Sequence, residues 1–358
     1  MTLRPNLKAM PLALEDFDEI IDVRSPSEFA EDHLSGAVNL PVLDDEQRSE
    51  VGTVYKQESA FEARKIGAAM TSAQISRHLA SHFASKSNDY HPLIYCWRGG
   101  QRSGSLATIL SEVGFRVDVL EGGYKAYRRE VVSAIERMAR DLRLVVLNGY
   151  TGAGKTKVLE LLSLQGAQVI DLEGMAQHKG SVFGGDLEHP QPSQKRFESL
   201  IYDSLLAVDL GRPILIEAES AKIGRLNLPN PLWQKMKASP VIEIETPRPI
   251  RARYLTEDYQ EWLGDIGRIE KTLDRLQPFH SKERLLTWKR MARNREWESL
   301  VEELLLHHYD QKYTVGGEGN YEVPSVSVAL SGHTENELAT VGLDVMAEAD
   351  KLVERLDR

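Results

Sequence analysis

The sequence predicts an α/β protein with two parallel-sheet domains, the second of which carries extra helices. Three observations support this prediction. The chain has 358 residues, a length that suits two or three domains of ordinary size. Short apolar segments alternate with helical stretches in two separate blocks. A basic helical segment lies between these blocks, and we place the domain boundary there.

The first block, residues 1–123, is expected to form a small α/β domain. Apolar runs predict strands at Glu19–Arg24, Pro92–Tyr95 and Val117–Leu120. Helices are expected over Pro26–Asp32, over most of residues 44–87, and over Gln101–Val113, with a turn at His33–Pro41. Residues 124–142 are the basic helical connector between the two domains.

The second block, residues 143–313, repeats the alternation of apolar and helical segments. Its expected strands are Leu144–Leu147, Gln168–Ile170, Pro213–Ile216 and Val241–Ile244, and residues 249–309 read as a long helical extension. Residues 314–358 are glycine-rich and then acidic, and we interpret them as a C-terminal tail.

Composition excludes several classes of protein. The single cysteine, Cys96, excludes an intrachain disulfide framework and any zinc site that needs two thiolates. No run of 18 apolar residues and no secretory signal pattern occurs, so we expect a cytoplasmic protein that does not enter a membrane. The net charge of −10 argues against a surface generally coated in basic side chains. No prosthetic group and no dedicated set of metal ligands is expected.

The first candidate site is a cysteine at the end of a strand. Cys96 precedes a loop with two glycines, and a helix follows it. Backbone N–H groups of such a loop converge on an anion, and together with nearby arginines they lower a thiol pKa. We therefore expect a nucleophilic thiolate in an anion cradle. Its candidate catalytic residues are Cys96, Arg98, Gly99, Gly100 and Arg102.

The second candidate site is a P-loop. Residues 149–156 fit the pattern G-x-x-x-x-G-K-[ST] between an apolar strand and a helix. The pattern predicts that a di- or triphosphate binds, with Lys155 on the phosphate oxygens and Thr156 suited to Mg²⁺. The candidate phosphate-binding residues are Gly149, Thr151, Gly152, Ala153, Gly154, Lys155 and Thr156.

Polar residues after the neighbouring strands are candidate substrate contacts near this loop, because ligands bind at the carboxyl ends of parallel strands. They are Asp171, His178, Lys179, Ser181, Glu217, Glu219, Lys222 and Arg225. Glu217 occupies the place of a metal-associated acid. Arg248 and Arg251 begin a helix after the next strand and either approach the phosphates or lie on a solvated helix face.

The motifs of the first domain resemble those of rhodanese domains. The resemblance is carried by Asp22–Arg24, Glu28–Phe29, His33–Pro41 and Leu120–Gly123. One departure matters: an arginine lies six residues after the cysteine, at Arg102, where sulfurtransferases of that family have it five residues after. The longer loop, followed by Ser103, has the spacing of cysteine-dependent phosphatases, so we expect a wider pocket.

A rhodanese-like domain joined to a P-loop domain, with the strings Val51–Gln57 and Asp171–Gly184, resembles the tRNA 2-selenouridine synthase family. The resemblance implies a transferase that acts on 2-thiouridine at the wobble position of tRNA. It implies S-geranylation from geranyl diphosphate, then replacement of the S-geranyl group by selenium from selenophosphate. The P-loop would hold the diphosphate, with Mg²⁺ as a compatible ion, and the Cys96 loop would receive the selenium donor.

An RNA substrate needs basic contacts. The implied partners are the anticodon region of tRNA and a selenophosphate supply system. Candidate tRNA contacts are Lys125, Arg128, Arg129, Lys289, Arg290 and Arg293. Trp288 and Trp297 lie near the second cluster and either stack on a splayed base or anchor a core.

Three alternatives remain open from the sequence. The Cys96–Arg102 spacing also suits a cysteine-dependent phosphatase or a sulfurtransferase with a nucleotide-binding P-loop domain. An inactive rhodanese fold could serve as a binding adaptor, although the intact cysteine and both arginines argue against it. The P-loop would also suit an ATP-dependent RNA or nucleoside kinase, which would show Lys155-dependent kinase activity.

Overall fold

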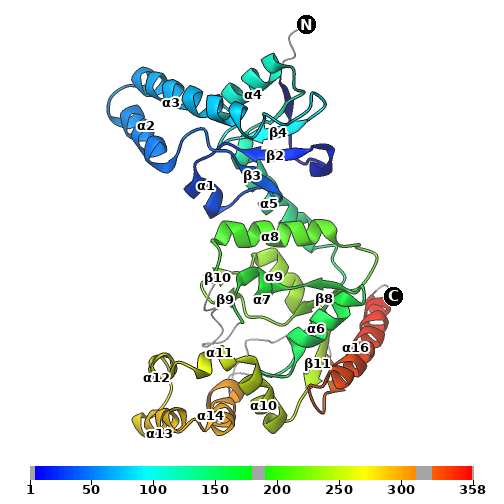
Figure 1. Ribbon diagram of the computed structural model, residues 1–358. Coiled ribbons are helices and arrows are strands. Elements are labelled where there is room, and N and C mark those ends of the chain that lie inside the picture. The colour runs from blue at the N-terminus through cyan, green and yellow to red at the C-terminus, as the bar shows by residue number, and fades with distance from the viewer. Residues whose placement is uncertain (1–4, 180–189, 312–324, 357–358) are drawn as a thin grey trace. The chain divides into compact units, whose positions relative to one another are not determined.

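The computed structural model describes residues 5–179, 190–311 and 325–356 and divides the chain into two compact units, each with its own sheet (Figure 1). The first unit comprises residues 1–135 and 192–203, and the second comprises residues 136–191 and 204–358. Both contain parallel strands with helices between them, which confirms the predicted fold class.

The first unit is built on a five-stranded sheet with the order β1-β5-β4-β2-β3, and every neighbouring pair is parallel. Its central strand β4 is buried along its whole length, as expected for a parallel strand covered on both faces. The strands are β1 (Asn6–Lys8), β2 (Glu19–Asp22), β3 (Ala37–Asn39), β4 (Pro92–Tyr95) and β5 (Asp118–Leu120).

Local signals set the helix boundaries in this unit. Pro26 follows the N-cap Ser25, whose capping box with Glu28 starts α1. Gly114 ends α4 in a left-handed conformation. The helical elements are η1 (Leu14–Asp16), α1 (Pro26–Glu31), α2 (Asp45–Gln57), α3 (Ala60–Ala80), α4 (Gln101–Val113), α5 (Gly123–Ala139) and α8 (Gln194–Ala207), of which α5 and α8 continue into the second unit.

The second unit has a parallel sheet with the order β12-β11-β6-β8-β7 and a separate two-stranded hairpin. The predicted strands are all present. The strands are β6 (Leu144–Asn148), β7 (Gln168–Ile170), β8 (Ile214–Glu217), β9 (Lys222–Ile223), β10 (Leu226–Asn227), β11 (Val241–Glu245) and β12 (Ser325–Ala329).

The helical extension predicted for residues 249–309 is also present, and it has its own core around the buried Trp288. Side chains of Asp265 and Ser281 cap two of its helices. The helical elements of the second unit are α6 (Lys155–Leu164), α7 (Leu172–Ala176), α9 (Asn230–Lys237), α10 (Arg248–Asp258), α11 (Gln260–Leu263), α12 (Ile266–Asp274), α13 (Lys282–Arg293), α14 (Trp297–Leu304), the π-helical turn η2 (Leu305–Tyr309) and α16 (Glu335–Leu356).

The interpretation of residues 314–358 as a tail is wrong for its described part. Strand β12 pairs with β11 at the edge of the sheet, and α16 packs beside α6 (Figure 1). Val341, Val345 and Ala349 of α16 are buried in the same core as Val158 and Leu162 of α6. The acidic composition obscured an apolar face at helical spacing that completes the second unit.

Candidate functional site

Cys96 lies directly after β4, and the loop from Cys96 to Gly100 leads into the N-terminus of α4. The cysteine is 3% exposed. Gly99 adopts a left-handed φ of 65°, and a Cβ atom there would lie 2.6 Å from the carbonyl oxygen of Leu120. Glycine at this position therefore allows the backbone to make the tight turn that an anion-binding loop requires.

The environment of Cys96 lowers the pKa of its thiol. Burial alone would raise this pKa, but hydrogen bonds from the Ser103 hydroxyl and from the backbone N–H groups of Ser103 and Arg98, with the charge of Arg102, outweigh that effect. Ser103 Oγ lies 3.2 Å from Cys96 Sγ and also 3.2 Å from the carbonyl oxygen of Gly100, so its single proton serves two acceptors. The site therefore stabilises the thiolate form of Cys96 relative to an ordinary cysteine.

Arg98 of this loop and Arg102 in the first turn of α4 differ in their surroundings. Arg98 is exposed. Arg102 is partly buried, and its Nη1 donates a 2.6 Å hydrogen bond to Oε2 of Glu28. Burial would raise the pKa of Glu28, but the hydrogen bond and charge of Arg102 hold it below its usual range. Glu28 thus fixes the guanidinium of Arg102 beside the thiol loop.

The glycines that follow β5 pack directly against this loop. A Cβ atom at Gly123 would lie 2.2 Å from the carbonyl oxygen of Cys96 and 2.4 Å from the backbone N of Gly99. The backbone N–H of Tyr124 donates to the carbonyl oxygen of Cys96 at 2.8 Å. The string Leu120–Gly123 therefore packs directly against the Cys96 loop, and no residue larger than glycine fits at Gly123.

The string Asp22–Arg24 has a structural role in the first unit. Both side chains are fully buried, and Arg24 donates to the carboxylate of Asp22 and to the carbonyl oxygen of Asp32. The guanidinium of Arg24 also lies 3.9 Å from the centre of the Tyr124 ring. These contacts tie the end of β2 to the start of α5, next to the Cys96 loop.

The P-loop connects β6 to α6. Gly149, Gly152 and Gly154 all have positive φ angles, and a Cβ at Gly149 would lie 2.8 Å from the carbonyl oxygen of Ile244. Thr246 Oγ1 donates to the carbonyl oxygen of Ala153 at 3.2 Å and pins the loop to the end of β11. The backbone geometry is that of a phosphate-binding nest.

Lys155, Thr156 and Glu217 meet at this loop. Lys155 Nζ lies 3.0 Å from the carbonyl oxygen of Gly149 and 3.5 Å from Glu217 Oε1. Thr156 Oγ1 donates to Glu217 Oε2 at 3.0 Å. The prediction that Glu217 lies beside the P-loop is thereby confirmed.

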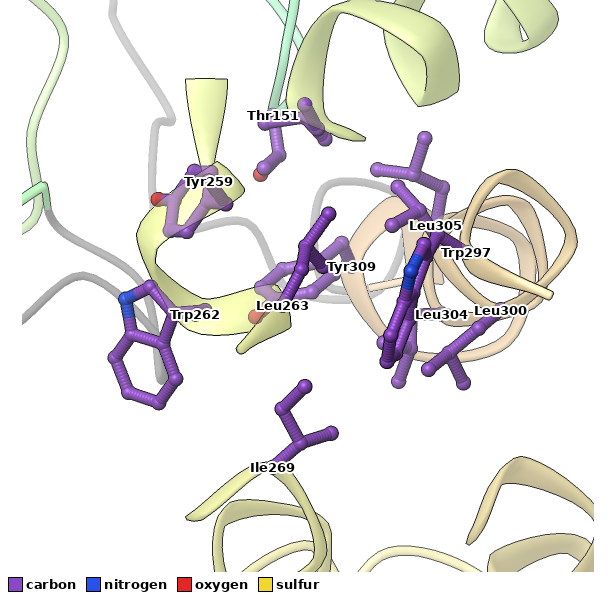
Figure 2. A pocket seen from close by; sticks show the side chains of 12 residues that line it. Thr151, Tyr259, Trp262, Leu263, Ile269, Trp297, Leu300, Leu304, Leu305 and Tyr309 are labelled. Atoms are coloured by element: carbon purple, nitrogen blue, oxygen red, sulfur yellow. The ribbon is translucent and has the colours of Figure 1, made fainter. Parts of the chain in front are cut away.

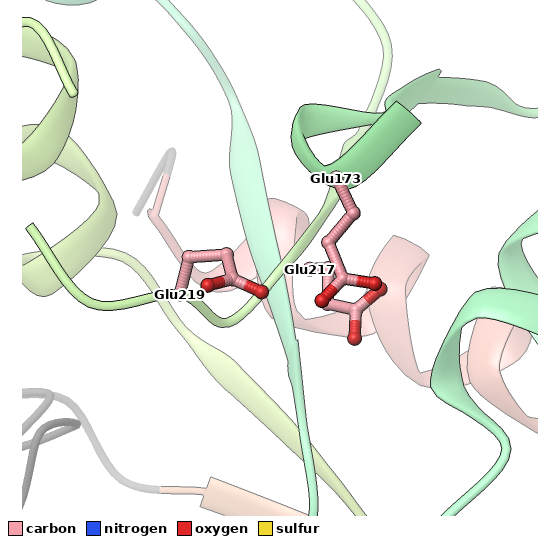
Figure 3. Close-up of side chains that lie close together, drawn as sticks. All are labelled: Glu173, Glu217 and Glu219. Atoms are coloured by element: carbon pink, nitrogen blue, oxygen red, sulfur yellow. The ribbon is translucent and has the colours of Figure 1, made fainter. Parts of the chain in front are cut away.

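Two further carboxylates join Glu217. Oxygen atoms of Glu173, Glu217 and Glu219 lie within 4.8 Å of one another, and Figure 3 shows their side chains pointing toward a common region. Burial, followed by the charges of Glu217 and Glu219, raises the pKa of Glu173, and burial with the charge of Glu217 raises that of Glu219. A cation would relieve this repulsion, and oxygen ligands are those that Mg²⁺ prefers. Glu173 was not among the site residues predicted from the sequence, and no set of metal ligands was expected.

The structure disperses the remaining residues of the two polar strings. Asp171 caps α7 by accepting from the backbone N–H of Gly174. Lys179 Nζ forms an ion pair with Asp258 at 2.6 Å. Arg225 donates to the backbone carbonyl oxygen of Gln191. Lys222 is exposed, His178 is partly buried with its Nδ1 unpartnered among the described residues, and Ser181 lies outside those residues.

Arg251 does not lie on a solvated helix face. It is 3% exposed, and its guanidinium donates to Asp310 and to the backbone carbonyl oxygens of Thr246 and Thr151. Arg248 forms an ion pair with the same Asp310 at 3.1 Å. The two arginines join α10 to Asp310, the residue after η2, and Arg251 also bonds to the P-loop backbone at Thr151. Both guanidinium groups are therefore engaged within the protein, an arrangement that matches neither of the two alternatives considered from the sequence.

One residue beside the P-loop was missed. The ring of His333 lies 3.0 Å from the position that a Cβ on Gly154 would take, and it stacks on Tyr254 with ring centres 4.2 Å apart. Its Nε2 is buried without a partner among the described residues, and burial lowers its pKa. Val328 and Leu330, two residues apart and both buried, precede His333 in the sequence. This apolar alternation is the signal that would have predicted β12 and the loop that carries His333.

The candidate tRNA contacts fall into two groups. Lys125, Arg129 and Arg290 are exposed. Arg128 bonds to Glu198 and Ser199, and its contact with tRNA stays a prediction. Further ion pairs join Lys289 to Asp274 and Arg293 to Glu270, both at 2.6 Å.

The structure excludes the stacking interpretation for Trp288. Trp288 is 0% exposed in the core of the helical extension, and Trp297 packs against that core. A fully buried indole cannot stack on a base, so the alternative of a core anchor holds for Trp288. In the part of the chain that the structure describes, no helix is both long and apolar enough to cross a membrane.

Comparison with known proteins adds independent findings. The family model of the rhodanese-like domain matches residues 7–130, and that of the tRNA 2-selenouridine synthase AAA domain matches residues 142–267. The tRNA 2-selenouridine synthase of Nitrosomonas europaea is 37% identical over 261 residues, which are 71% of this chain and 67% of that protein.

Further relatives bear the same name. The proteins of Sulfurovum sp. and Nitrosomonas eutropha are 39% and 34% identical, over 67% and 73% of this chain and 65% and 68% of their own lengths. The alignments thus span about two thirds of each relative. A solved structure, the N-terminal domain of a putative ATP/GTP-binding protein from Clostridium difficile 630, is 37% identical; the match covers 35% of this chain and 98% of that chain, with a TM-score of 0.31.

Proposed function

Because the chain belongs to the tRNA 2-selenouridine synthase family, we propose that it converts 2-thiouridine in the anticodon region of tRNA to 2-selenouridine in two steps. The P-loop unit transfers a geranyl group from geranyl diphosphate to sulfur, and the Cys96 loop then supplies selenium from selenophosphate. The observation that carries this proposal is that this chain contains both a complete P-loop and, in an anion cradle, a thiol whose pKa is lowered.

In the first step the thiouridine sulfur attacks the allylic carbon of the prenyl donor. A C–S bond forms, the C–O bond breaks, diphosphate leaves with the electron pair, and the N3 proton of the base is released. Lys155 and the N–H groups of the P-loop stabilise the departing charge. Mg²⁺, when bound, neutralises further charge, and the oxygens of Thr156, Glu217 and Glu173 are the groups that would hold it.

In the second step we assign nucleophilic attack to Cys96. Its thiolate attacks the phosphorus of selenophosphate, so an S–P bond forms and hydroselenide leaves with the electrons of the P–Se bond. Hydroselenide then displaces geranylthiolate from C2 of the base, and water hydrolyses the phosphocysteine to phosphate and thiol. The wider loop ending at Arg102 and the Ser103 hydroxyl suit a phosphate group bound at the thiol.

The test is nucleoside mass spectrometry of thiolated tRNA incubated with the protein, geranyl diphosphate and selenophosphate. Lys155→Ala should reduce S-geranylation about 10²–10³-fold, the usual loss for one charge-stabilising group. Cys96→Ser should leave S-geranylation unchanged and abolish selenium incorporation. Equal loss of both products in Cys96→Ser would refute the division of labour, and Cys96-dependent turnover of an aryl phosphate without any tRNA product would favour a phosphatase.

A further inference from the structure

An apolar pocket opens beside the P-loop in the second unit (Figure 2). The space between its walls is about 620 Å³ when the solvent at its open mouth is included. Its walls come from the P-loop and from α10, α11, α12, α14 and η2. The lining residues are Thr151, Leu255, Tyr259, Trp262, Leu263, Ile269, Trp297, Leu300, Val301, Leu304, Leu305 and Tyr309.

The chemistry of the lining selects a hydrocarbon. Among the described residues no charged side chain lines the pocket, and four of the lining residues are aromatic. Besides the hydroxyl groups of Thr151, Tyr259 and Tyr309 and the indole N–H groups, the side chains that line it offer no polar group. A nucleoside base would leave most of its donors and acceptors unpaired in such a pocket, which is costly. An apolar chain needs no partner and gains from leaving water.

The pocket is continuous with the phosphate-binding loop. Thr151 belongs to that loop and lines the pocket, and Leu255 of the pocket lies 2.8 Å from where a Cβ on Gly152 would be. Arg251 holds the backbone of Thr151 at 3.1 Å and pairs with Asp310, next to the lining residue Tyr309. In Figure 2, Thr151 lies at one end of the pocket and Ile269 at the opposite end.

We propose that this pocket holds the hydrocarbon chain of the prenyl diphosphate whose diphosphate group lies on the P-loop. The assignment rests on the proposed function and adds the residues that recognise the chain. Each fully buried methylene contributes about fourfold in affinity, so the five further carbons of a ten-carbon chain could contribute up to about 10³-fold. We expect a ten-carbon chain to bind at least tenfold more tightly than a five-carbon chain. The far wall at Ile269 then limits the length of chain that fits.

The test is isothermal titration of the full chain, in buffer with Mg²⁺, with inorganic diphosphate, dimethylallyl diphosphate and geranyl diphosphate. Ile269→Trp fills the far end of the pocket. Because Ile269 is buried, a second variant, Val301→Trp, fills the pocket from a position that is only partly buried. Leu306→Trp is the matched control, since Leu306 lies in η2, is 38% exposed and is not part of the lining.

We expect both pocket variants to weaken geranyl diphosphate binding at least tenfold and to bind inorganic diphosphate like the unaltered chain. Dimethylallyl diphosphate should lose less than threefold, and Leu306→Trp should change none of the three. A variant that merely misfolds would lose inorganic diphosphate as well.

If both pocket variants bind geranyl diphosphate and geranylate tRNA like the unaltered chain, the chain lies elsewhere and the inference is wrong, while the proposed function stands. If the unaltered protein binds geranyl diphosphate no better than inorganic diphosphate, the pocket assignment also fails. Absence of any geranylated nucleoside with the unaltered protein would instead refute the proposed function.

Discussion

Replacing Ser103 with alanine should raise the pKa of the Cys96 thiol. The Ser103 hydroxyl lies 3.2 Å from Sγ, and a hydrogen bond to a charged group contributes about 1.5–3 kcal/mol. Its single proton is shared with the carbonyl oxygen of Gly100, so we take the lower end of this range. Since about 1.4 kcal/mol corresponds to a factor of ten, the thiolate fraction below the midpoint should fall about tenfold.

The assay is the rate of iodoacetamide alkylation as a function of pH. Cys96 is the only cysteine in the sequence, so every alkylation event reports on this site. Ser103→Ala should move the midpoint to higher pH and slow the reaction about tenfold at any pH below it. Ser105→Ala is the control, because the Ser105 hydroxyl bonds the carbonyl oxygen of Gln101 in the same helix. An unchanged midpoint in Ser103→Ala, or an equal shift in Ser105→Ala, would refute the reasoning.

Three further outcomes are expected. Gly123→Ala should abolish selenium incorporation but keep S-geranylation, because its Cβ would collide with the carbonyl oxygen of Cys96. Gly36→Ala is the control and should keep both products in the same assay, because Gly36 has a similar φ and no atom lies near the position of the added Cβ. Burial raises the pKa of the Asp203 carboxyl to about 6. The folded protein therefore loses stability relative to the unfolded chain as the pH rises from about 4 through about 6. Asp203→Asn should therefore raise Tm by roughly 3 °C at pH 8 and leave it unchanged near pH 4 in thermal scans. Reversing the charge of the exposed Lys125 and Arg129 should weaken tRNA binding and lower its salt slope by about two in filter binding, whereas an unchanged slope would remove this surface as a tRNA contact.

The sequence predicted the two loops well because each motif is contiguous. The strand, the glycines and the reactive side chain of the P-loop lie within a dozen residues, and the same is true of the loop after Cys96. Local steric rules therefore fix both loops almost independently of the rest of the chain. The predicted position of Glu217 followed from the rule that strand ends meet at one sheet edge.

Features that depend on distant partners could not be predicted from the sequence. The role of Arg251 stayed open between a phosphate contact and a solvated helix face, because its partner Asp310 lies 59 residues away along the chain. The acidic residues of 335–356 concealed the apolar face by which α16 completes the second core. Glu173 joins Glu217 and Glu219 only through the packing of α7, and the pocket exists only where α10, α11, α12, α14 and η2 meet the P-loop.

The central claim is that the P-loop serves prenyl transfer alone and the Cys96 loop serves selenium alone. The most direct test supplies tRNA that already carries S-geranyl-2-thiouridine, with selenophosphate, to Lys155→Ala and Cys96→Ser, and measures 2-selenouridine by mass spectrometry. We predict that Lys155→Ala forms 2-selenouridine at the rate of the unaltered protein and that Cys96→Ser forms none. Loss of the product in Lys155→Ala, or its formation by Cys96→Ser, would contradict the account.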